Sequence, residues 1–334
     1  MLYDCETEAN GYVLGSEYVG GIIGALNQSD TQTALLSENG TRTTVNASYV
    51  IGNSYVGGII GENKGGSTIK NCVNTGVAAG YNAYIGGICG ANENKAAIIN
   101  CASYVSDTNN AIYRRVTDWG AVGSYAGGLT GYNSGTITFS DKNNAVSTRS
   151  VAGIVVGRHY VGGLVGYAAC GLKISDSFAA TVIGQQTSET VGGLVGYAHD
   201  TIEISGSYAD CYLYGRHVGG LIGGAAAGNS SFKNCYAAGY IYAQKTAAGF
   251  LPQAAAHIEN AYAVIKYANA AYVKAYAAVS ACGDAKNLYY IADDGVLSVV
   301  GQAVNYETLS KRDTFAKKLG AAFSATTGGD HTFA

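Results

Sequence analysis

Cysteine and histidine are the residue types here best suited to metal binding or nucleophilic chemistry, and their spacing supports neither. The chain contains eight cysteines and five histidines. No Cys-x-x-Cys pair and no His-Glu-x-x-His run occurs among them, although structural zinc, dithiol redox and zinc-peptidase sites are built on those spacings. We therefore expect no metal, no cofactor and no catalytic residue.

Two weaker arrangements of polar residues remain as alternatives. His159 and His217 each stand just before a Gly-Gly pair, and a metal-binding pair there is less favoured than two exposed turn residues. A carbohydrate-processing enzyme would need clustered carboxylates along one groove. The candidates Asp176, Glu203 and Asp210 fall at different positions of the repeat, among serines and glycines, which argues against that chemistry.

Tyrosine is abundant enough to form an extended surface, with 27 copies. A ladder along the molecule is expected where tyrosines share one position of a stacked repeat. Those that do are Tyr18, Tyr55, Tyr84, Tyr125 and Tyr160. We interpret them first as a structural stack. As function, an exposed row would be a platform for sugar rings or for a protein partner.

An insertion at 104–124 interrupts the repeat and contains the single tryptophan, Trp119, together with Arg114, Arg115 and Asp118. Loops on a rigid scaffold often carry function, and Trp and Arg are enriched in binding hot spots. These four residues are our candidate ligand-binding site. A hairpin that simply covers the scaffold is the favoured structural alternative.

The elements that must position these residues are defined by a repeat of about 29 residues. A Gly-Gly pair followed by an aliphatic residue recurs seven times, at intervals of 27 to 41 residues. Residues without Cβ are needed where a chain bends sharply or where another backbone approaches closely. The resulting glycine ladder comprises Gly20, Gly21, Gly57, Gly58, Gly86, Gly87, Gly127, Gly128, Gly162, Gly163, Gly192, Gly193, Gly219 and Gly220.

A second word of the repeat centres on Asn-Cys. Asn, Asp and Gly tolerate left-handed backbone, so the first position of the word predicts a turn, and stacked Asn side chains could form an amide ladder. This position holds Asp4, Asn46, Asn71, Asn100, Asp176, Gly206, Asn234, Asn260 and Asn287.

Two further ladders are expected in the core. The first is a small apolar ladder of Cys5, Cys72, Cys101 and Cys235; a disulfide between neighbouring cysteines is the less favoured alternative. The second is the aliphatic position after the glycine pair, comprising Ile22, Ile59, Ile88, Leu129, Leu164, Leu194 and Leu221. The next residue is also mostly apolar, so the sequence leaves open which of the two faces the core.

Repeats of this length must stack to bury their apolar faces, and short alternating segments indicate strands. A propeller blade needs roughly 40–50 residues, so the unit length favours an all-β fold, a right-handed parallel β-helix of about nine to ten coils. At about 4.8 Å per coil it would be roughly 45 Å long. We assign residues 1–305 to the helix, with insertions at 25–45 and 104–124. Residues 306–334 form a cap, with a short helix at 306–320 that covers the last coil, and a loose tail.

Charge and composition narrow the choice of partners. The net charge is −3 without a long basic run, which argues against nucleic acid. No stretch of roughly 20 apolar residues suggests membrane insertion. The N-terminal residues do not resemble a signal peptide. Because residues 1–24 already look like a complete unit, we expect the chain to be a segment of a longer protein.

The alternation of Val-Gly-Gly-Leu-Val-Gly with Asn-Cys-Tyr-Ala-x-Gly resembles the GLUG-repeat family, well over residues 3–250 and loosely beyond. This resemblance implies a segment of a secreted or cell-surface bacterial protein, such as an adhesin or part of an immunoglobulin A peptidase, and it transfers no catalytic residue. We therefore expect a non-catalytic structural or adhesive module that binds an unidentified host or matrix glycan or protein. The alternatives are a self-assembling extracellular filament subunit and a β-helix carbohydrate-processing enzyme.

Overall fold

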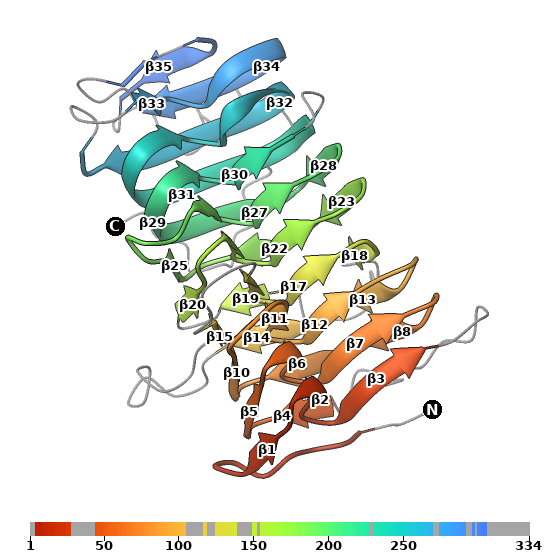
Figure 1. Ribbon diagram of the computed structural model, residues 1–334. Coiled ribbons are helices and arrows are strands. Elements are labelled where there is room, and N and C mark those ends of the chain that lie inside the picture. The colour runs from red at the N-terminus through yellow and green to blue at the C-terminus, as the bar shows by residue number, and fades with distance from the viewer. Residues whose placement is uncertain are drawn as a thin grey trace.

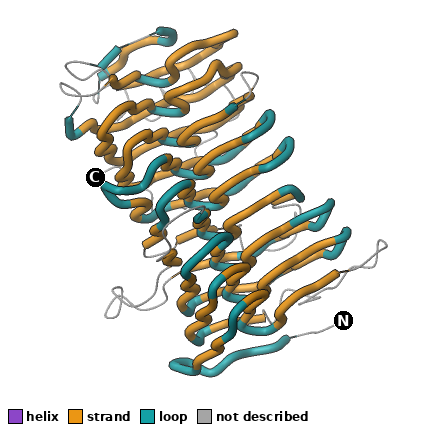
Figure 2. Tube along the Cα trace, in the orientation of Figure 1, coloured by secondary structure: helices purple, strands orange, loops and turns teal. Residues whose placement is uncertain are grey.

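The fold is a parallel β-solenoid (Figure 1). The structure, a computed structural model, describes residues 4–27, 44–104, 116–118, 124–138, 149–151, 154–226, 230–269, 274–291, 296–297 and 299–305. Figure 2 shows this part of the chain as strands joined by short turns, without a helix. No described segment is therefore a helix that could cross a membrane.

Two parallel sheets account for the described strands. The smaller sheet contains β3 (Ile23–Asn27), β7 (Ile60–Lys64), β12 (Cys89–Asn92), β17 (Thr130–Asn133), β22 (Val165–Ala168), β27 (Val195–Ala198) and β30 (Ile222–Ala225). The larger sheet contains β1 (Tyr12–Leu14), β2 (Glu17–Gly20), β4 (Thr44–Asn46), β5 (Tyr49–Gly52), β6 (Ser54–Gly57), β8 (Thr68–Lys70), β9 (Cys72–Asn74), β10 (Val77–Gly80), β11 (Ile85–Gly86), β13 (Ala97–Ile99), β14 (Ala102–Tyr104), β15 (Val116–Asp118), β16 (Tyr125–Gly127), β18 (Thr136–Thr138), β19 (Arg149–Val151), β20 (Ile154–Val156), β21 (Tyr160–Gly162), β23 (Leu172–Ser175), β24 (Phe178–Ala179), β25 (Val182–Gly184), β26 (Thr190–Gly192), β28 (Ile202–Ser205), β29 (Tyr208–Gly219), β31 (Ser230–Ala248), β32 (Leu251–Tyr267), β33 (Lys274–Tyr276), β34 (Val279–Ile291) and β35 (Gln302–Val304).

Inner strands pair in parallel with the strands one turn before and one turn after them. Val161 of β21, for example, lies between Ala126 of β16 and Val191 of β26. Residues at one position of the repeat therefore form rows that run along the solenoid axis. This in-register stacking explains the sequence repeat, because each position of the repeat occupies one row of the solenoid.

The solenoid has about seven turns that contribute a strand to both sheets, and β32 and β34 continue only the larger sheet. The expected nine to ten coils are not supported, because the degenerate repeats after residue 250 add no described strand to the smaller sheet. The expected capping helix at 306–320, within the 306–334 segment, lies outside the described residues.

The core consists of aliphatic rows. Both apolar positions that follow the Gly-Gly pair belong to it, although the sequence leaves open which of the two faces inward. Leu164 and Leu194 are fully buried, and so are the residues that follow them, Val165 and Val195. Two successive side chains can both enter the interior because the chain turns a corner between the larger and the smaller sheet at this point. The rule that successive side chains of a strand point to opposite faces does not apply at this corner.

The Gly-Gly pair forms that corner. A Cβ atom on Gly192 would lie 1.9 Å from the carbonyl oxygen of Val195, and one on Gly193 would lie 2.0 Å from the carbonyl oxygen of Gly220 in the next turn. The third glycine of the word is equally constrained, since a Cβ on Gly196 would lie 2.5 Å from the carbonyl oxygen of Gly166. Close backbone approach therefore explains the glycine content.

The Asn-Cys word forms a second corner. Asn71, Asn100, Asn234, Asn260 and Asn287 all have left-handed backbone, with φ between 51° and 55°. Their amides bond from turn to turn: Asn100 Nδ2 donates to Asn71 Oδ1 over 2.6 Å, and Asn287 Nδ2 donates to Asn260 Oδ1 over 2.8 Å. Side-chain amides thus tie successive turns together at this corner.

Asn46 does not belong to this row, which corrects its assignment from the sequence. It pairs with Asn74, and its Nδ2 donates to Asn74 Oδ1 over 2.7 Å inside the solenoid. A further buried row joins Asn63, Asn92 and Asn133 through two amide bonds of 2.8 Å each. Buried amides are costly unless they are satisfied, so these rows fix the register between turns.

Candidate functional site

Tyrosines from six successive turns gather beside the Gly-Gly corner. The first row is the one expected from the sequence: Tyr18, Tyr55, Tyr84, Tyr125 and Tyr160. The second row comes from the smaller sheet and comprises Tyr132, Tyr167 and Tyr197. We call these eight residues the tyrosine surface. All eight side chains are at least partly exposed.

The rings of the first row follow one another at nearly the spacing of the turns. The ring centroids of Tyr18 and Tyr55 are 4.7 Å apart, those of Tyr55 and Tyr84 are 4.9 Å apart, and those of Tyr125 and Tyr160 are 5.1 Å apart. Offset and edge-on ring pairs at such distances contribute about 0.5–1.5 kcal/mol each beyond burial. The row therefore stabilises the stack of turns as well as presenting a surface.

The second row was not predicted, although its signal is present in the sequence. Tyr132, Tyr167 and Tyr197 each follow the third glycine of the repeat word. Their rings contact the first row across the corner, with centroid distances of 4.9 Å from Tyr125 to Tyr167 and 4.7 Å from Tyr160 to Tyr197. Tyrosine recurs here in three consecutive turns only, so a comparison of all seven repeats obscures it.

Backbone strain marks the N-terminal part of the first row. Tyr18, Tyr55 and Tyr84 have left-handed backbone, with φ of 54°, 55° and 70°. This conformation costs a residue with a bulky side chain about 1–2 kcal/mol, and such strain concentrates at functional sites. The surrounding glycine corner and the ring stack hold the three tyrosines in place despite this cost.

The phenol groups of the tyrosine surface are the polar atoms it offers to a ligand. Among the described residues none of these hydroxyls has a hydrogen-bond partner. Burial, followed by the neighbouring tyrosines, raises the pKa of Tyr125 and Tyr167. Burial and the nearby Glu93 carboxylate raise the pKa of Tyr132 to about 12. These three phenols therefore remain protonated well above neutral pH.

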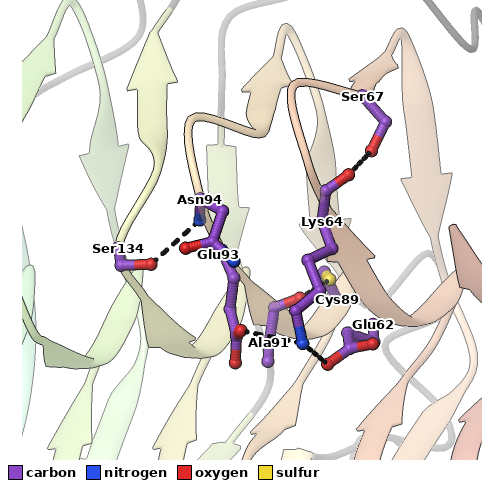
Figure 3. A network of polar contacts seen from close by, with 8 residues as sticks. All are labelled: Glu62, Lys64, Ser67, Cys89, Ala91, Glu93, Asn94 and Ser134. Carbon is purple, nitrogen blue, oxygen red and sulfur yellow. Dashed lines mark hydrogen bonds and ion pairs between the residues drawn. The ribbon is translucent and has the colours of Figure 1, made fainter. Parts of the chain in front are cut away.

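An ion-pair network lies at the N-terminal end of the second row (Figure 3). Lys64 Nζ is 2.9 Å from Glu62 Oε1 and 3.3 Å from Glu93 Oε2. Glu62 belongs to the same row as Tyr132, with Ala91 between them. Hydrogen bonds to these carboxylates raise the pKa of Lys64, so the ammonium group stays charged and is shared between two acids.

The two histidines that we considered as a metal pair do not share a row. His217 occupies the row of Tyr160 and Thr190, whereas His159 precedes that row by one residue. His217 Nδ1 lies 2.8 Å from Thr246 Oγ1, and burial lowers its pKa. The described residues contain no cluster of three or more groups able to hold a metal ion.

The three candidate acids lie in separate rows. Asp176 takes the left-handed corner position, with φ of 49°. Glu203 pairs with Lys173 over 2.8 Å. Asp210 lies on β29, opposite Ala238 of β31. No two of them stack on one another in the described register.

An open groove on the outer face of β31, β32 and β34 brings other reactive residue types together. Ser231, His257 and Asp284 are register neighbours there. The structure records no hydrogen bond between them, and His257 and Asp284 are exposed to solvent. A serine nucleophile needs a base within hydrogen-bond reach and a third group that orients it, and this arrangement lacks both contacts.

Most of the candidate residues of the 104–124 insertion are not among the residues that the structure describes. Arg114, Arg115 and Trp119 lie outside the described residues. Asp118 ends β15, a strand in register with β10, where it pairs with Gly80. The insertion therefore does not consist of a separate hairpin throughout, since residues 116–118 belong to the solenoid.

The four cysteines of the expected core ladder form no disulfide with one another. Cys72, Cys101 and Cys235 are buried, and Cys5 is partly buried. Cys72 and Cys235 donate to backbone carbonyl oxygens of Lys70 and Lys233. Burial raises the pKa of Cys235 to about 12, which leaves it an unreactive thiol at neutral pH.

Comparison with known proteins identifies a motif in this scaffold. The family profile described as the GLUG motif matches residues 52–78, which extend from the end of β5 into β10 and include the corner at Gly57 and Gly58. No curated protein matches the chain. One solved structure, described as "a putative immunoglobulin A1 protease from Bacteroides ovatus", is 17% identical with a TM-score of 0.39 over 92% of this chain and 69% of that chain. A likeness this distant carries no argument about function.

Proposed function

We propose that this chain, a β-solenoid that carries the GLUG motif, is a non-catalytic adhesive module of a secreted or cell-surface bacterial protein. The tyrosine surface is its binding face for a host or matrix glycan or protein. One observation carries the proposal: eight tyrosines from successive turns adjoin on a rigid scaffold, and their hydroxyls have no partner among the described residues. Aromatic residues with a polar tip are typical of binding surfaces.

The test is a binding screen on arrays of glycans and host proteins. Wild type is compared with a Tyr125→Ala/Tyr167→Ala variant, with Trp119→Ala, and with Tyr212→Ala as an exposed control outside the tyrosine surface. Loss of binding in the double variant alone supports the proposal. Loss in Trp119→Ala alone moves the site to the 104–124 insertion. Absence of any binding by wild type rejects an adhesive role.

Self-assembly into filaments is the second candidate, and the first turn supports it. Among the described strands, β1 and β2 each pair with one neighbour, and Tyr12 and Leu14 are 67% and 70% exposed. Unpaired strand edges with apolar side chains favour edge-to-edge association. Sedimentation of wild type and Leu14→Lys at increasing concentration tests this candidate. A single monomeric species for wild type at all concentrations rejects it.

A further inference from the structure

We infer that the tyrosine surface takes a neutral, hydroxyl-rich glycan chain, laid along the solenoid axis and bound by the phenolic edges of the rings rather than by their faces. The inference rests on the proposed function, and it specifies the ligand class and the mode of contact at the same surface.

Most ring faces are already covered by other rings, although Tyr55 and Tyr84 meet edge to face, at 77°. Tyr167 stacks against Tyr125, Tyr160 and Tyr197, at interplanar angles of 20°, 27° and 5°. Tyr18 and Tyr55 are likewise stacked, at 29°. A sugar ring that packs on an aromatic side chain needs a free face. The interior of the tyrosine surface does not offer one, in contrast to the platform of rings considered from the sequence.

The edges remain available, and each carries a hydroxyl group. A phenol donates one hydrogen bond and accepts others, and a glycan presents the same kind of group along its whole length. No described residue pairs with these phenols, so binding exchanges bonds to water for bonds to ligand without breaking a protein contact. A purely apolar ligand would leave the phenols unpaired, which is unfavourable.

Most of the charged groups at the tyrosine surface form ion pairs with one another. Lys64 lies between Glu62 and Glu93, and Arg216 Nη1 lies 2.6 Å from Glu189 Oε2. The first cluster has one carboxylate in excess, and the second is neutral. An acidic polymer would therefore meet a weakly negative surface at one end and no unpaired cation in either cluster, which disfavours it.

Two exposed charges adjoin the first row along the chain. Glu17 precedes Tyr18, and Arg158 stands two residues before Tyr160. They are of opposite sign and lie at the two ends of the row, so they do not change the net charge of the tyrosine surface. The combination of many hydroxyls and little net charge favours an uncharged polyhydroxylated ligand.

The rows set the direction of the ligand. The tyrosine surface extends from the turn of Tyr18 to the turn of Tyr197, five steps of about 4.8 Å, or about 24 Å along the axis. A glycan aligned with the rows contacts successive hydroxyls, and each additional contact is intramolecular once the chain is bound. Affinity is expected to rise with oligosaccharide length until the ligand spans the rows.

The experiment separates edges from faces by removing hydroxyls and keeping rings. Binding of neutral cello-, xylo- and manno-oligosaccharides of increasing length is measured by calorimetry for wild type, Tyr125→Phe/Tyr167→Phe, Tyr125→Ala/Tyr167→Ala and the control Tyr212→Phe. Polygalacturonate and hyaluronan serve as acidic ligands. We expect about tenfold weaker binding of a neutral oligosaccharide in the Phe double variant, from two lost hydrogen bonds, and no change in Tyr212→Phe. Thermal unfolding checks that each variant is folded.

The possible outcomes distinguish the mode of contact, the ligand class and the proposed function. Full binding in the Phe variant with loss in the Ala variant overturns the edge mode but leaves the proposed function intact. Preference for the acidic ligands overturns the neutral class. No binding of any neutral or acidic ligand overturns the inference, and the proposed function falls with it only if the host-protein array is also negative.

Discussion

Glycine and tyrosine have opposite roles at the same corner. Gly192 is required because its missing Cβ leaves room for the Val195 carbonyl oxygen, whereas Tyr84 accepts a left-handed backbone that glycine would adopt without strain. Replacing Tyr84 by Gly would relieve the backbone and remove ring contacts to Tyr55 and Tyr125. Tyrosine at this strained position therefore supplies ring contacts between turns that glycine could not make.

The glycine requirement predicts a large loss of stability at the corner. Gly192→Ala places a methyl group 1.9 Å from a carbonyl oxygen of the backbone, and the corner has to open to accommodate it. We expect the free energy of unfolding to fall by about 3 kcal/mol or more, measured by urea denaturation. Gly171→Ala is the matched control, because the nearest atom to its Cβ is 3.6 Å away. Equal effects of the two substitutions would contradict this account.

At the scale of the strands, rows of equivalent residues are the stabilising unit. The three asparagine rows and the tyrosine rows all arise from parallel pairing without a shift between turns. Within the first tyrosine row, burial raises the pKa of Tyr55, Tyr84, Tyr125 and Tyr160 in the same direction. Their combined titration is therefore visible in the stability of the whole solenoid.

Alkaline pH is expected to destabilise the fold through its buried thiols and phenols. Burial raises the pKa of Cys211 and Cys235 from 9.0 to about 12, and that of Tyr132 from 10.0 to about 12. Each neutral group favours the folded state, so its contribution is complete below its unfolded pKa and is lost as the pH rises through its folded pKa. We expect the urea midpoint to fall between pH 9 and pH 12. In Tyr132→Phe the decline above pH 10 should be shallower; an unchanged profile would contradict the role of Tyr132.

The sequence predicted the strands and most of the rows, and its errors have local causes. The Gly-Gly and Asn-Cys words predict the positions of the corners, because the backbone conformation at a corner restricts which residue types can occupy it. Asn46 was assigned to the wrong row because the Ala47-Ser48-Tyr49 segment that follows it is similar to the Ser177-Phe178 pair that follows Asp176. Only the pairing of Thr44 with Cys72 sets its register. The second tyrosine row depends on which residues meet across the corner, and spacing along the chain does not contain that information.

At the scale of the whole molecule, stability is distributed unevenly along the axis. Inner strands such as β6 and β21 pair on two sides, whereas in the described part of the chain β1 and β2 pair on one. In stacked repeats, nearest-neighbour interfaces supply most of the stability. The first turn is therefore expected to open more readily than the turns that follow it.

Amide hydrogen exchange measures this gradient. Amides of Tyr12–Leu14 and Glu17–Gly20 are expected to exchange faster than those of the equivalent strands Tyr49–Gly52 and Ser54–Gly57, because local opening of an end turn breaks one interface instead of two. Mass spectrometry after timed labelling resolves these segments. Uniform protection along the axis would show that the first turn is covered, as by a second copy of the chain.

The bonds that join the turns run along the axis, as in Leu164 N–H to the Leu194 carbonyl over 2.9 Å and Leu194 N–H to the Leu221 carbonyl over 2.8 Å. A pulling force applied to the two chain ends breaks these bonds one after another where the chain leaves the terminal turn, which therefore peels away before the next one opens. The turn from Gly162 to Gly192 comprises 30 residues, so its release adds about 100 Å of extended chain. A rod built in this way lengthens stepwise under tension and dissipates mechanical work, as an extensible tether does.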